Sequence, residues 1–225
     1  VHAQSWSFRG KIAAGRQFDV VRGPNKTIHL VSSRYYRLDA AGAVVADEAV
    51  GDGQSGSLSF PPAIAVGDDG SVHLVTRHGG DFTNGFQLRY RRKNAAGQWD
   101  RDYDVGTPVK RNYVVGAAWL NANQVVLLST QGGSNVWGDL HLWMANAGSA
   151  AKLGSISGIW RADCDARLRA GSRLWLSSGK PDPGGTGAYL LHASAGAQLV
   201  ADLKANQKTH KGSGRTGFAT TYVDG

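Results

Sequence analysis

Residues 62–76 read Pro-Ala-Ile-Ala-Val-Gly-Asp-Asp-Gly-Ser-Val-His-Leu-Val-Thr. Two apolar, β-prone runs flank a polar segment, residues 67–70. Asp-Gly between two such runs is a strong hairpin signal, because these residues tolerate the positive φ that a tight turn needs. The stretch therefore predicts two antiparallel strands, residues 62–66 and 72–76, joined by a short turn.

The run at residues 72–76 recurs, so that the chain contains four related runs. They are centred on His29, His73, Val126 and Leu174, with spacings of 44, 53 and 48 residues. Each run is followed by a small-residue turn, and the turn glycines are 55, 51 and 48 residues apart: Gly42, Gly97, Gly148 and Gly196. Periods of this length are typical of propellers and solenoids. Because two independent anchors give matching periods, we treat the repeat as real.

Each unit contains four short β-like runs separated by turns. The second unit continues with a loop from His78 to Gly85, a run at residues 86–92 and a last run at residues 99–105. No stretch outside the turns carries a capped 3.6-residue apolar period, so we expect little helix. Four-stranded antiparallel units that repeat radially form β-propeller blades. We therefore predict an all-β propeller rather than a linear β-solenoid, whose repeats are usually shorter.

We expect a single domain over residues 1–225, with blades at residues 17–60, 61–112, 113–160 and 161–215. Residues 216–225 match the first strand and turn of a further blade, and residues 5–11 match an outer strand that would close the ring. A seven-bladed ring needs roughly 350 residues at about fifty per blade. The sequence therefore predicts that a longer polypeptide, or a second chain, completes the propeller.

The net charge of +8 points to an acidic partner, since a positive field attracts anionic ligands. Nucleic acid, an acidic polysaccharide and no anionic partner at all are the alternatives. No DNA-binding helix, zinc finger or aromatic RNA-binding motif is present, which argues against nucleic acid. The basic run Arg89–Lys93 alternates between two faces of its strand, so we interpret it as a solvated edge. An acidic polysaccharide or oligosaccharide is the partner that we expect.

The sequence also bears on location. It contains no apolar run of eighteen residues, so no membrane-spanning segment is predicted. Val1-His2-Ala3 before Gln4 is similar to the small-residue end of a signal-peptide cleavage site, which predicts a secreted or periplasmic protein. An arbitrary boundary of the sequence is the alternative. The single cysteine, Cys164, excludes an internal disulfide and is interpreted as a buried structural residue.

Ligands of propellers usually bind where the central channel opens, close to the loops that join the second and third strands of each blade. Four polar residues stand at equivalent or adjoining positions there, and they are Arg34, His78, Gln131 and Lys180. Further candidates for substrate binding adjoin them or lie in the blade-linking segments: Ser59, Arg77, Arg111, Tyr113, Trp137, Arg161, His210 and Arg215. These side chains suit an anion or a sugar. The alternatives are that the strand ends simply meet water and that Trp137 packs on a neighbouring blade.

The histidines fall into two groups. His29, His73, His141 and His192 lie inside strands and are predicted to be packed or hydrogen-bonded core residues, whereas His78 ends a strand. No two histidines have the close spacing of a metal-binding pair, so we predict no metal site and no cofactor. A structural or substrate-bridging calcium ion remains an alternative. No nucleophile-elbow, P-loop or dinucleotide motif is present either.

The stretch from Pro61 to Val75, followed by His78 and residues 88–92, resembles one blade of the BNR-type propellers. It is similar in particular to propellers among the polysaccharide lyases, such as the ulvan lyases. In those enzymes a His or Tyr abstracts the C5 proton of a uronic acid while an Arg neutralises its carboxylate. His78 falls on the second histidine of the family pattern, and Ser59 falls on the first.

The resemblance implies a polysaccharide lyase that acts on uronate-containing polysaccharide by β-elimination. The catalytic residues would be His78, Tyr113 and Arg111. A non-catalytic lectin or interaction scaffold is the alternative, because a fold alone does not specify function. A glycoside hydrolase on the same fold is a further alternative.

Overall fold

The computed structural model describes residues 18–50, 62–81, 83–121, 124–132 and 137–160, and the backbone of residues 165–169, 173–182, 185–191 and 208–212. These residues form sixteen β-strands and one 3₁₀ turn, η1 (Pro24–Lys26). The predicted all-β class and low helix content are confirmed. The predicted strand at residues 5–11, the start of a further blade at residues 216–225 and Cys164 lie outside the described residues.

The strands form four antiparallel sheets, each with its four strands in chain order. Sheet A contains β1 (Asp19–Arg22), β2 (Ile28–Val31), β3 (Arg34–Leu38) and β4 (Val44–Ala49). Sheet B contains β5 (Ala63–Val66), β6 (Val72–Asp81), β7 (Gly85–Lys93) and β8 (Trp99–Val109). Sheet C contains β9 (Arg111–Asn121), β10 (Gln124–Gly132), β11 (Trp137–Ala145) and β12 (Ala150–Trp160). Sheet D contains β13 (Asp165–Arg169), β14 (Arg173–Asp182), β15 (Gly185–Leu191) and β16 (Lys208–Gly212).

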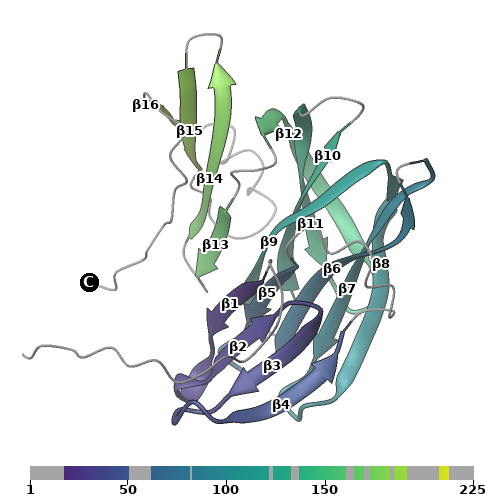
Figure 1. The fold of residues 1–225 in the computed structure, drawn as a ribbon, viewed down its shortest axis with the longest axis vertical. Coiled ribbons are helices and arrows are strands. Elements are labelled where there is room, and N and C mark those ends of the chain that lie inside the picture. Colours follow the sequence, from purple (N-terminus) through teal and green to yellow (C-terminus); the bar gives the residue numbers. More distant parts are fainter. Residues whose placement is uncertain are drawn as a thin grey trace, which may run out of the picture.

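The four sheets succeed one another along the chain. Sheets A, B and D fall within the ranges 17–60, 61–112 and 161–215, and β9 of sheet C begins at Arg111, two residues before the expected start at 113. Figure 1 shows the sheets following one another in chain order. Their first strands are neighbours, since β1 contacts β5, β5 contacts β9 and β9 contacts β13.

Two apolar cores hold consecutive sheets together. Alternation along each strand sends one set of side chains to each face of a sheet, so a sheet between two others buries both faces. The core between sheets A and B consists of Val31, Tyr35, Val50, Ile64, Val72 and Leu74. The core between sheets B and C includes Val75, Leu88, Tyr90, Val105, Val114, Val125, Leu127 and Trp143. Sheet B is therefore sandwiched between its two neighbours.

The first two units have the same backbone hydrogen bond at their first turn. In each, a glycine amide donates to the carbonyl four residues later, Gly23 to Thr27 at 2.9 Å and Gly67 to Ser71 at 2.8 Å. The strands on either side also have the same register, with Asp19 opposite Val31 and Ala63 opposite Val75. The spacing of 44 residues that was read from the sequence is thus a structural equivalence, residue by residue.

Candidate functional site

His78 forms a pair with a carboxylate on the outermost strand of sheet B. Its Nε2 lies 2.9 Å from Oδ1 of Asp104 on β8. The side chain of His78 is 19% exposed and that of Asp104 is 52% exposed, so solvent reaches the pair. A carboxylate at this distance orients the imidazole and determines which ring nitrogen carries a proton. His78 is an even number of residues from Val72 and Leu74 on β6 and therefore points to the same side, so the pair lies on the face of sheet B that is turned towards sheet A.

The prediction that His78 ends a strand and opens a loop is wrong. Strand β6 continues through His78 to Asp81, and β7 begins at Gly85. Gly79 and Gly80 have positive φ values of 55° and 72°, and the register with β7 shifts between His78 and Asp81. Glycine adopts this conformation without a steric cost, so it allows an irregularity inside a strand. The two glycines thus mark a bulge rather than the end of the strand.

The His78–Asp104 pair is one end of a row of alternating charges across β7 and β8, which we call the charge ladder. Arg89 Nε lies 2.5 Å from Asp102 Oδ1, and Arg89 Nη1 lies 3.6 Å from Asp104 Oδ1. Arg91 Nε follows at 3.4 Å from Asp102 Oδ2. The interpretation of Arg89–Lys93 as a solvated edge is wrong, because β7 is an inner strand between β6 and β8. Aspartates on β8 compensate its positive charge, so the ladder is close to neutral.

The other end of the ladder joins sheets A and B. Lys93 forms an ion pair with Glu48 of β4, and Trp99 Nε1 donates a hydrogen bond of 2.8 Å to Glu48 Oε2. The guanidinium of Arg91 lies over the Trp99 ring, 4.6 Å from its centroid. Burial alone would raise the pKa of Glu48, but the hydrogen bonds from Lys93 and Trp99 outweigh burial and hold this pKa below its usual range. This end of the ladder is a structural contact between two sheets.

Arg77 lies on the opposite face of sheet B from His78. Its guanidinium lies over the ring of Phe86, 3.1 Å from the ring centroid. The Asn112 amide on β9 donates a hydrogen bond of 3.2 Å to the Phe86 carbonyl. Consecutive residues of a strand point to opposite faces. Arg77 and His78 are adjacent in sequence and both were predicted site residues, but they cannot contact one ligand from the same face of sheet B.

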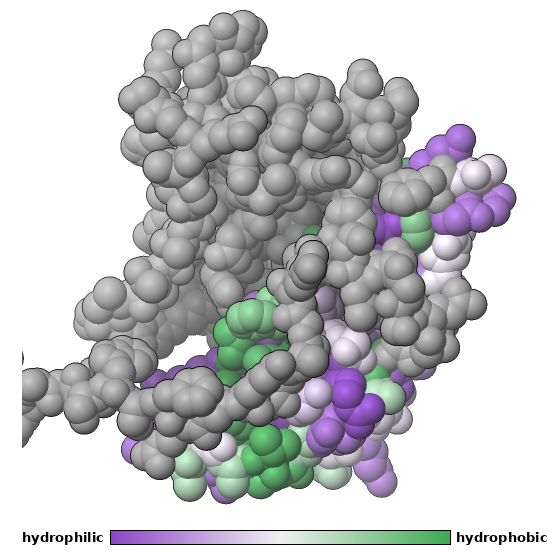
Figure 2. All heavy atoms as spheres, in the orientation of Figure 1, coloured by the Kyte–Doolittle hydropathy of each residue, from purple (hydrophilic) through white to green (hydrophobic). Residues whose placement is uncertain are grey.

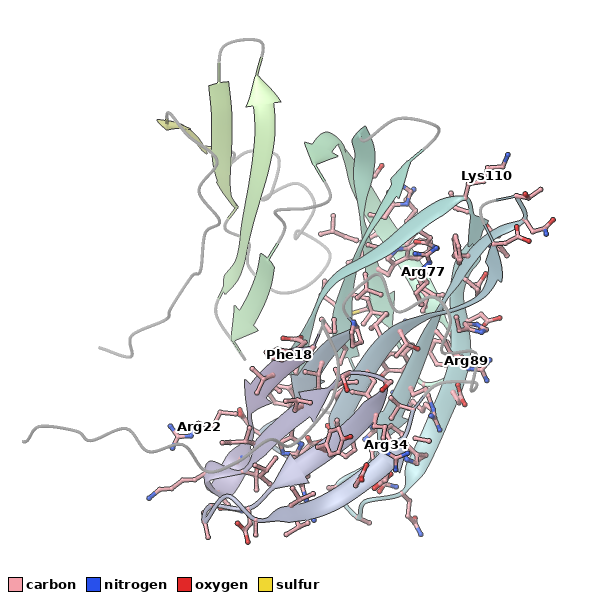
Figure 3. All side chains as sticks on the ribbon, viewed as in Figure 1. Phe18, Arg22, Arg34, Arg77, Arg89 and Lys110 are labelled. Atoms are coloured by element: carbon pink, nitrogen blue, oxygen red, sulfur yellow. The ribbon has the colours of Figure 1, made fainter. Side chains whose placement is uncertain are left out.

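Arg34 lies on sheet A, on a different face from both His78 and Arg77. Its Nε lies 2.5 Å from Asp47 Oδ1, and its Nη2 donates to the Asp47 carbonyl at 3.2 Å. The next residue, Tyr35, packs against sheet B, so Arg34 lies on the face of sheet A that is turned away from sheet B. Figure 3 shows Arg34, Arg77 and Arg89 well separated. The structure does not bring Arg34, Arg77 and His78 together.

The other predicted site residues are placed by their backbones. In sheet C, Arg111 pairs with Gly132, and Asn112 pairs with Gln131, so the start of β9 lies beside the end of β10. Trp137 begins β11 next to this end, and Tyr113 pairs with Thr130. In sheet D, Gly187 lies between Lys180 and Lys211, and His210 pairs with Ala188. Ser59, Arg161 and Arg215 lie outside the described residues.

The best-defined polar clusters surround His29 and His73, whose partners were not predicted from the sequence. His29 Nδ1 lies 2.9 Å from the hydroxyl of Tyr35, and its Nε2 lies 3.0 Å from Thr27 Oγ1. One unit later, His73 lies between two partners in the same way. Its Nδ1 is 2.7 Å from the hydroxyl of Tyr90, and its Nε2 is 2.9 Å from Ser71 Oγ. The spacing Gly-x₃-Ser/Thr-x-His, which occurs in both units, was the available signal. The prediction that His29 and His73 are hydrogen-bonded core residues is confirmed.

The partners also determine the protonation of both histidines. Ser71 Oγ donates to Asp69 Oδ1 at 2.6 Å, so this hydroxyl accepts the proton of His73 Nε2. Thr27 Oγ1 donates to the Pro24 carbonyl at 2.7 Å, so it likewise accepts from His29 Nε2. Each Nδ1 then accepts the hydroxyl proton of its tyrosine. Both rings are therefore neutral and carry their proton on Nε2.

Burial reinforces this neutral form. It lowers the pKa of His29 to about 4, with a smaller contribution from the charge of Arg37. It lowers the pKa of His73 to about 3, with a further contribution from Arg92. Burial also raises the pKa of Tyr35 to about 12. Because both histidines are buried and fully bonded, we assign them to the core and not to a reacting site.

The remaining observations concern metals, membranes and relatives. Within the residues that the structure describes, no three His, Cys, Asp or Glu side chains are grouped so that they could hold a metal ion. In the same residues, no helix is long and apolar enough to cross a membrane. The sequence matches no known family profile, and no curated protein is significantly similar to it.

Proposed function

We propose that this chain forms part of a β-propeller that binds acidic polysaccharide. The propeller is supported by four separate four-stranded sheets, each with its strands in chain order. It is also supported by the contacts between successive first strands, β1 with β5, β5 with β9 and β9 with β13. Radial repetition of such sheets around a channel produces both features.

The binding of an acidic glycan is supported by where the positive charge lies. Lys110 lies in the connection from β8 to β9, and Arg111 follows beside the β10–β11 end of sheet C. Lys180 and Lys211 flank Gly187 at the corresponding end of sheet D. Figure 3 shows Lys110 projecting into solvent just after β8, the last strand of sheet B. Since the charge ladder is compensated internally, these basic positions at the β10–β11 and β14–β15 ends are the better anion site.

Two charge-reversal variants test this proposal. Lys110→Glu should weaken the binding of a uronate oligosaccharide, whereas Lys152→Glu should not. Lys152 is also exposed, but it lies near the opposite end of sheet C, where β11 turns into β12. Binding measured by calorimetry should also weaken as salt rises, because screening reduces attraction beyond about 10 Å at 0.1 M. Equal loss in both variants, or equal affinity for a neutral glycan, would contradict the proposal.

Lyase activity is a second candidate function, and the His78–Asp104 pair is the observation that favours it. An imidazole that a carboxylate orients is suited to remove a proton. In β-elimination the base takes the C5 proton of the uronate, the C4–O bond breaks, and a C4–C5 double bond forms. Arg89, whose Nη1 lies 3.6 Å from Asp104 Oδ1, is the cation that we propose for the substrate carboxylate. The resemblance to BNR-type lyases points the same way.

Ultraviolet absorbance of unsaturated products on a panel of uronate polymers tests the lyase candidate. Activity should be lost in His78→Ala and reduced in Asp104→Asn. Arg34→Ala should retain activity, because Arg34 lies on another face. If the wild type binds these polymers but produces no absorbance change, the lyase candidate is excluded and the lectin function is the one supported. An extracellular or periplasmic location is part of this proposal, since acidic polysaccharides are found there.

A further inference from the structure

The His78–Asp104 pair joins two strands that are not neighbours in sheet B. His78 lies on β6 and Asp104 lies on β8, and β7 runs between them. Adjacent strands are about 4.8 Å apart, so β6 and β8 are separated by roughly twice that distance. The two side chains must therefore lean towards each other across β7 to meet at 2.9 Å. Their meeting depends on which side chains β7 presents on the same face.

Gln87 is the residue of β7 that stands beside His78. The two residues are register partners, so their Cβ atoms lie about 4.5–5.5 Å apart on the same face of sheet B. A side chain at position 87 that stood upright on this face would compete with the imidazole for the space over β7. The carboxamide of Gln87 turns towards β8 instead, where its Nε2 donates hydrogen bonds of 3.1 Å to the carbonyls of Val105 and Gly106.

These two carbonyls belong to a bulge of β8 that begins directly after Asp104. The register between β7 and β8 shifts at Gln87, which lies opposite residues 106–108. Gly106 has a positive φ of 70°, which glycine adopts without a steric cost. On the opposite face, a Cβ at Gly106 would lie 2.7 Å from the Trp143 ring. A bulge disrupts the ladder of backbone hydrogen bonds, and the Gln87 amide supplies donors to two of its carbonyls.

Gln87 is buried, whereas the pair beside it is accessible. Gln87 is 8% exposed, while the side chains of His78 and Asp104 are 19% and 52% exposed. Figure 2 shows hydrophilic residues gathered where Figure 1 places the turn from β6 to β7 and the end of β8. A buried, fully hydrogen-bonded amide beside an accessible pair is the arrangement of a residue that supports a site without touching the ligand.

We propose that Gln87 is a positioning residue for the His78–Asp104 pair. It binds the carbonyl of the residue that follows Asp104, and so holds β8 in the bulged conformation that brings the Asp104 carboxylate to His78 Nε2. Asp104 accepts the Nε2 proton, so Nδ1 carries the lone pair that would remove the C5 proton of a uronate. The inference rests on the proposed lyase function for what the pair does, but the positioning is a property of the free protein.

Nitrogen NMR of the histidine side chains tests the positioning without a substrate. At about pH 8, where an ordinary imidazole is neutral, His78 of the wild type should be one tautomer with its proton on Nε2. Its signals are assigned by their absence in His78→Gln. Gln87→Leu keeps the approximate size of the side chain but removes both donors, and His78 should then be a mixture of two tautomers. Gln98→Leu, in an exposed turn of the same sheet, should leave His78 unchanged.

Kinetics on a uronate polymer add a second readout. Gln87→Leu should lower kcat by about 10- to 100-fold with little change in KM, because a misplaced base slows the chemical step more than it weakens binding. In the Asp104→Asn background the same substitution should have no further effect, since Gln87 acts through Asp104. Gln98→Leu should retain the wild-type kcat.

A mixture of tautomers in the wild type, an unchanged tautomer in Gln87→Leu, or an equal change in Gln98→Leu would overturn the inference. Should Gln87→Leu fail to fold, Gln87→Asn decides, because its amide is one methylene shorter and cannot reach both carbonyls. An unchanged tautomer in Gln87→Asn would then refute the positioning role.

This inference and the proposed lyase function can fail separately. A tautomer mixture in Gln87→Leu, together with a wild type that binds uronate polymers but does not cleave them, would support the positioning and refute the lyase candidate. An active wild type with an unchanged His78 tautomer and full kcat in Gln87→Leu would do the reverse.

Discussion

His73 accepts the hydroxyl proton of Tyr90 across a distance of 2.7 Å, and His29 accepts that of Tyr35 in the same way one unit earlier. In both units the tyrosine lies on the strand that follows the histidine strand, opposite the residue two positions after the histidine. The connection between these strands is longer in the second unit, yet the pairing is unchanged. The pair therefore stabilises the register of the second and third strands independently of the loop that joins them.

Tyr90→Phe should destabilise the fold by about 1–3 kcal/mol. The substitution leaves the buried Nδ1 of His73 without its donor, and an unsatisfied buried acceptor loses its solvation without compensation. Urea unfolding at pH 7 measures the change. Tyr36→Phe is the matched control, because Tyr36 is also buried but its hydroxyl bonds the exposed Arg34, on the face of sheet A that is turned away from sheet B. A loss of the same size in both variants would show that the His73–Tyr90 bond has no special role.

Stability should fall as the pH decreases from 7 to 5. Both histidines have a pKa in the folded state, about 4 and about 3, that is below the ordinary value of 6.5. The unfolded chain therefore binds more protons than the folded chain between pH 6.5 and these values, so lowering the pH favours unfolding. Their contribution is fully present above pH 6.5, and the expected loss by pH 5 is on the order of a few kcal/mol for the pair.

Urea midpoints at pH 7 and pH 5 measure this loss. The interval lies above the usual range of carboxylates, so aspartates and glutamates contribute little to it. His73→Gln should reduce the dependence on pH while it lowers stability at pH 7. Equal midpoints at both pH values in the wild type would contradict the assigned neutral histidines.

The sequence predicted the repeat and its strands well, because turn residues and alternating apolar runs are local signals. Gly67–Gly70 between two β-prone runs produced a hairpin, as expected. The same local reasoning failed at Gly79-Gly80, where glycines make a bulge inside β6 instead of ending it. Pairing with β7 decided that outcome, and pairing is not visible in a short window of sequence.

The candidate site was harder to predict for a related reason. Arg77 and His78 are adjacent in the chain, but strand alternation separates them onto opposite faces of sheet B. The partners of His78 and Arg89 come from β8, more than ten residues further along the chain, and no local pattern links its aspartates to them. The Ser/Thr-x-His pattern was visible in the sequence, although its tyrosine partner lies on the following strand at a variable spacing.

Gly67→Ala should destabilise the fold by about 1–3 kcal/mol, the usual effect of overpacking. A Cβ at this position would lie 2.5 Å from Trp119 Nε1 and would also clash with the carboxylate of Asp69. That carboxylate accepts the hydroxyl of Ser71, so the clash would disturb the chain of hydrogen bonds to His73. Thermal unfolding measures the effect. The matched control is Gly148→Ala, whose Cβ would have nothing within 4 Å and which should be neutral or slightly stabilising.

Glu48→Ala should be more destabilising than Asp47→Ala, although the two residues are neighbours on β4. Glu48 faces sheet B, where Lys93 pairs with it and Trp99 donates to it. Its removal leaves the ammonium of Lys93, whose side chain is 12% exposed, without its carboxylate, and we expect a loss of about 2–4 kcal/mol. Asp47 faces solvent with Arg34, and exposed ion pairs contribute little. Urea unfolding of both variants at low and high salt measures the difference. A larger loss in Asp47→Ala, or a Glu48→Ala effect that salt abolishes, would show that the contact between the sheets is not the stabilising one.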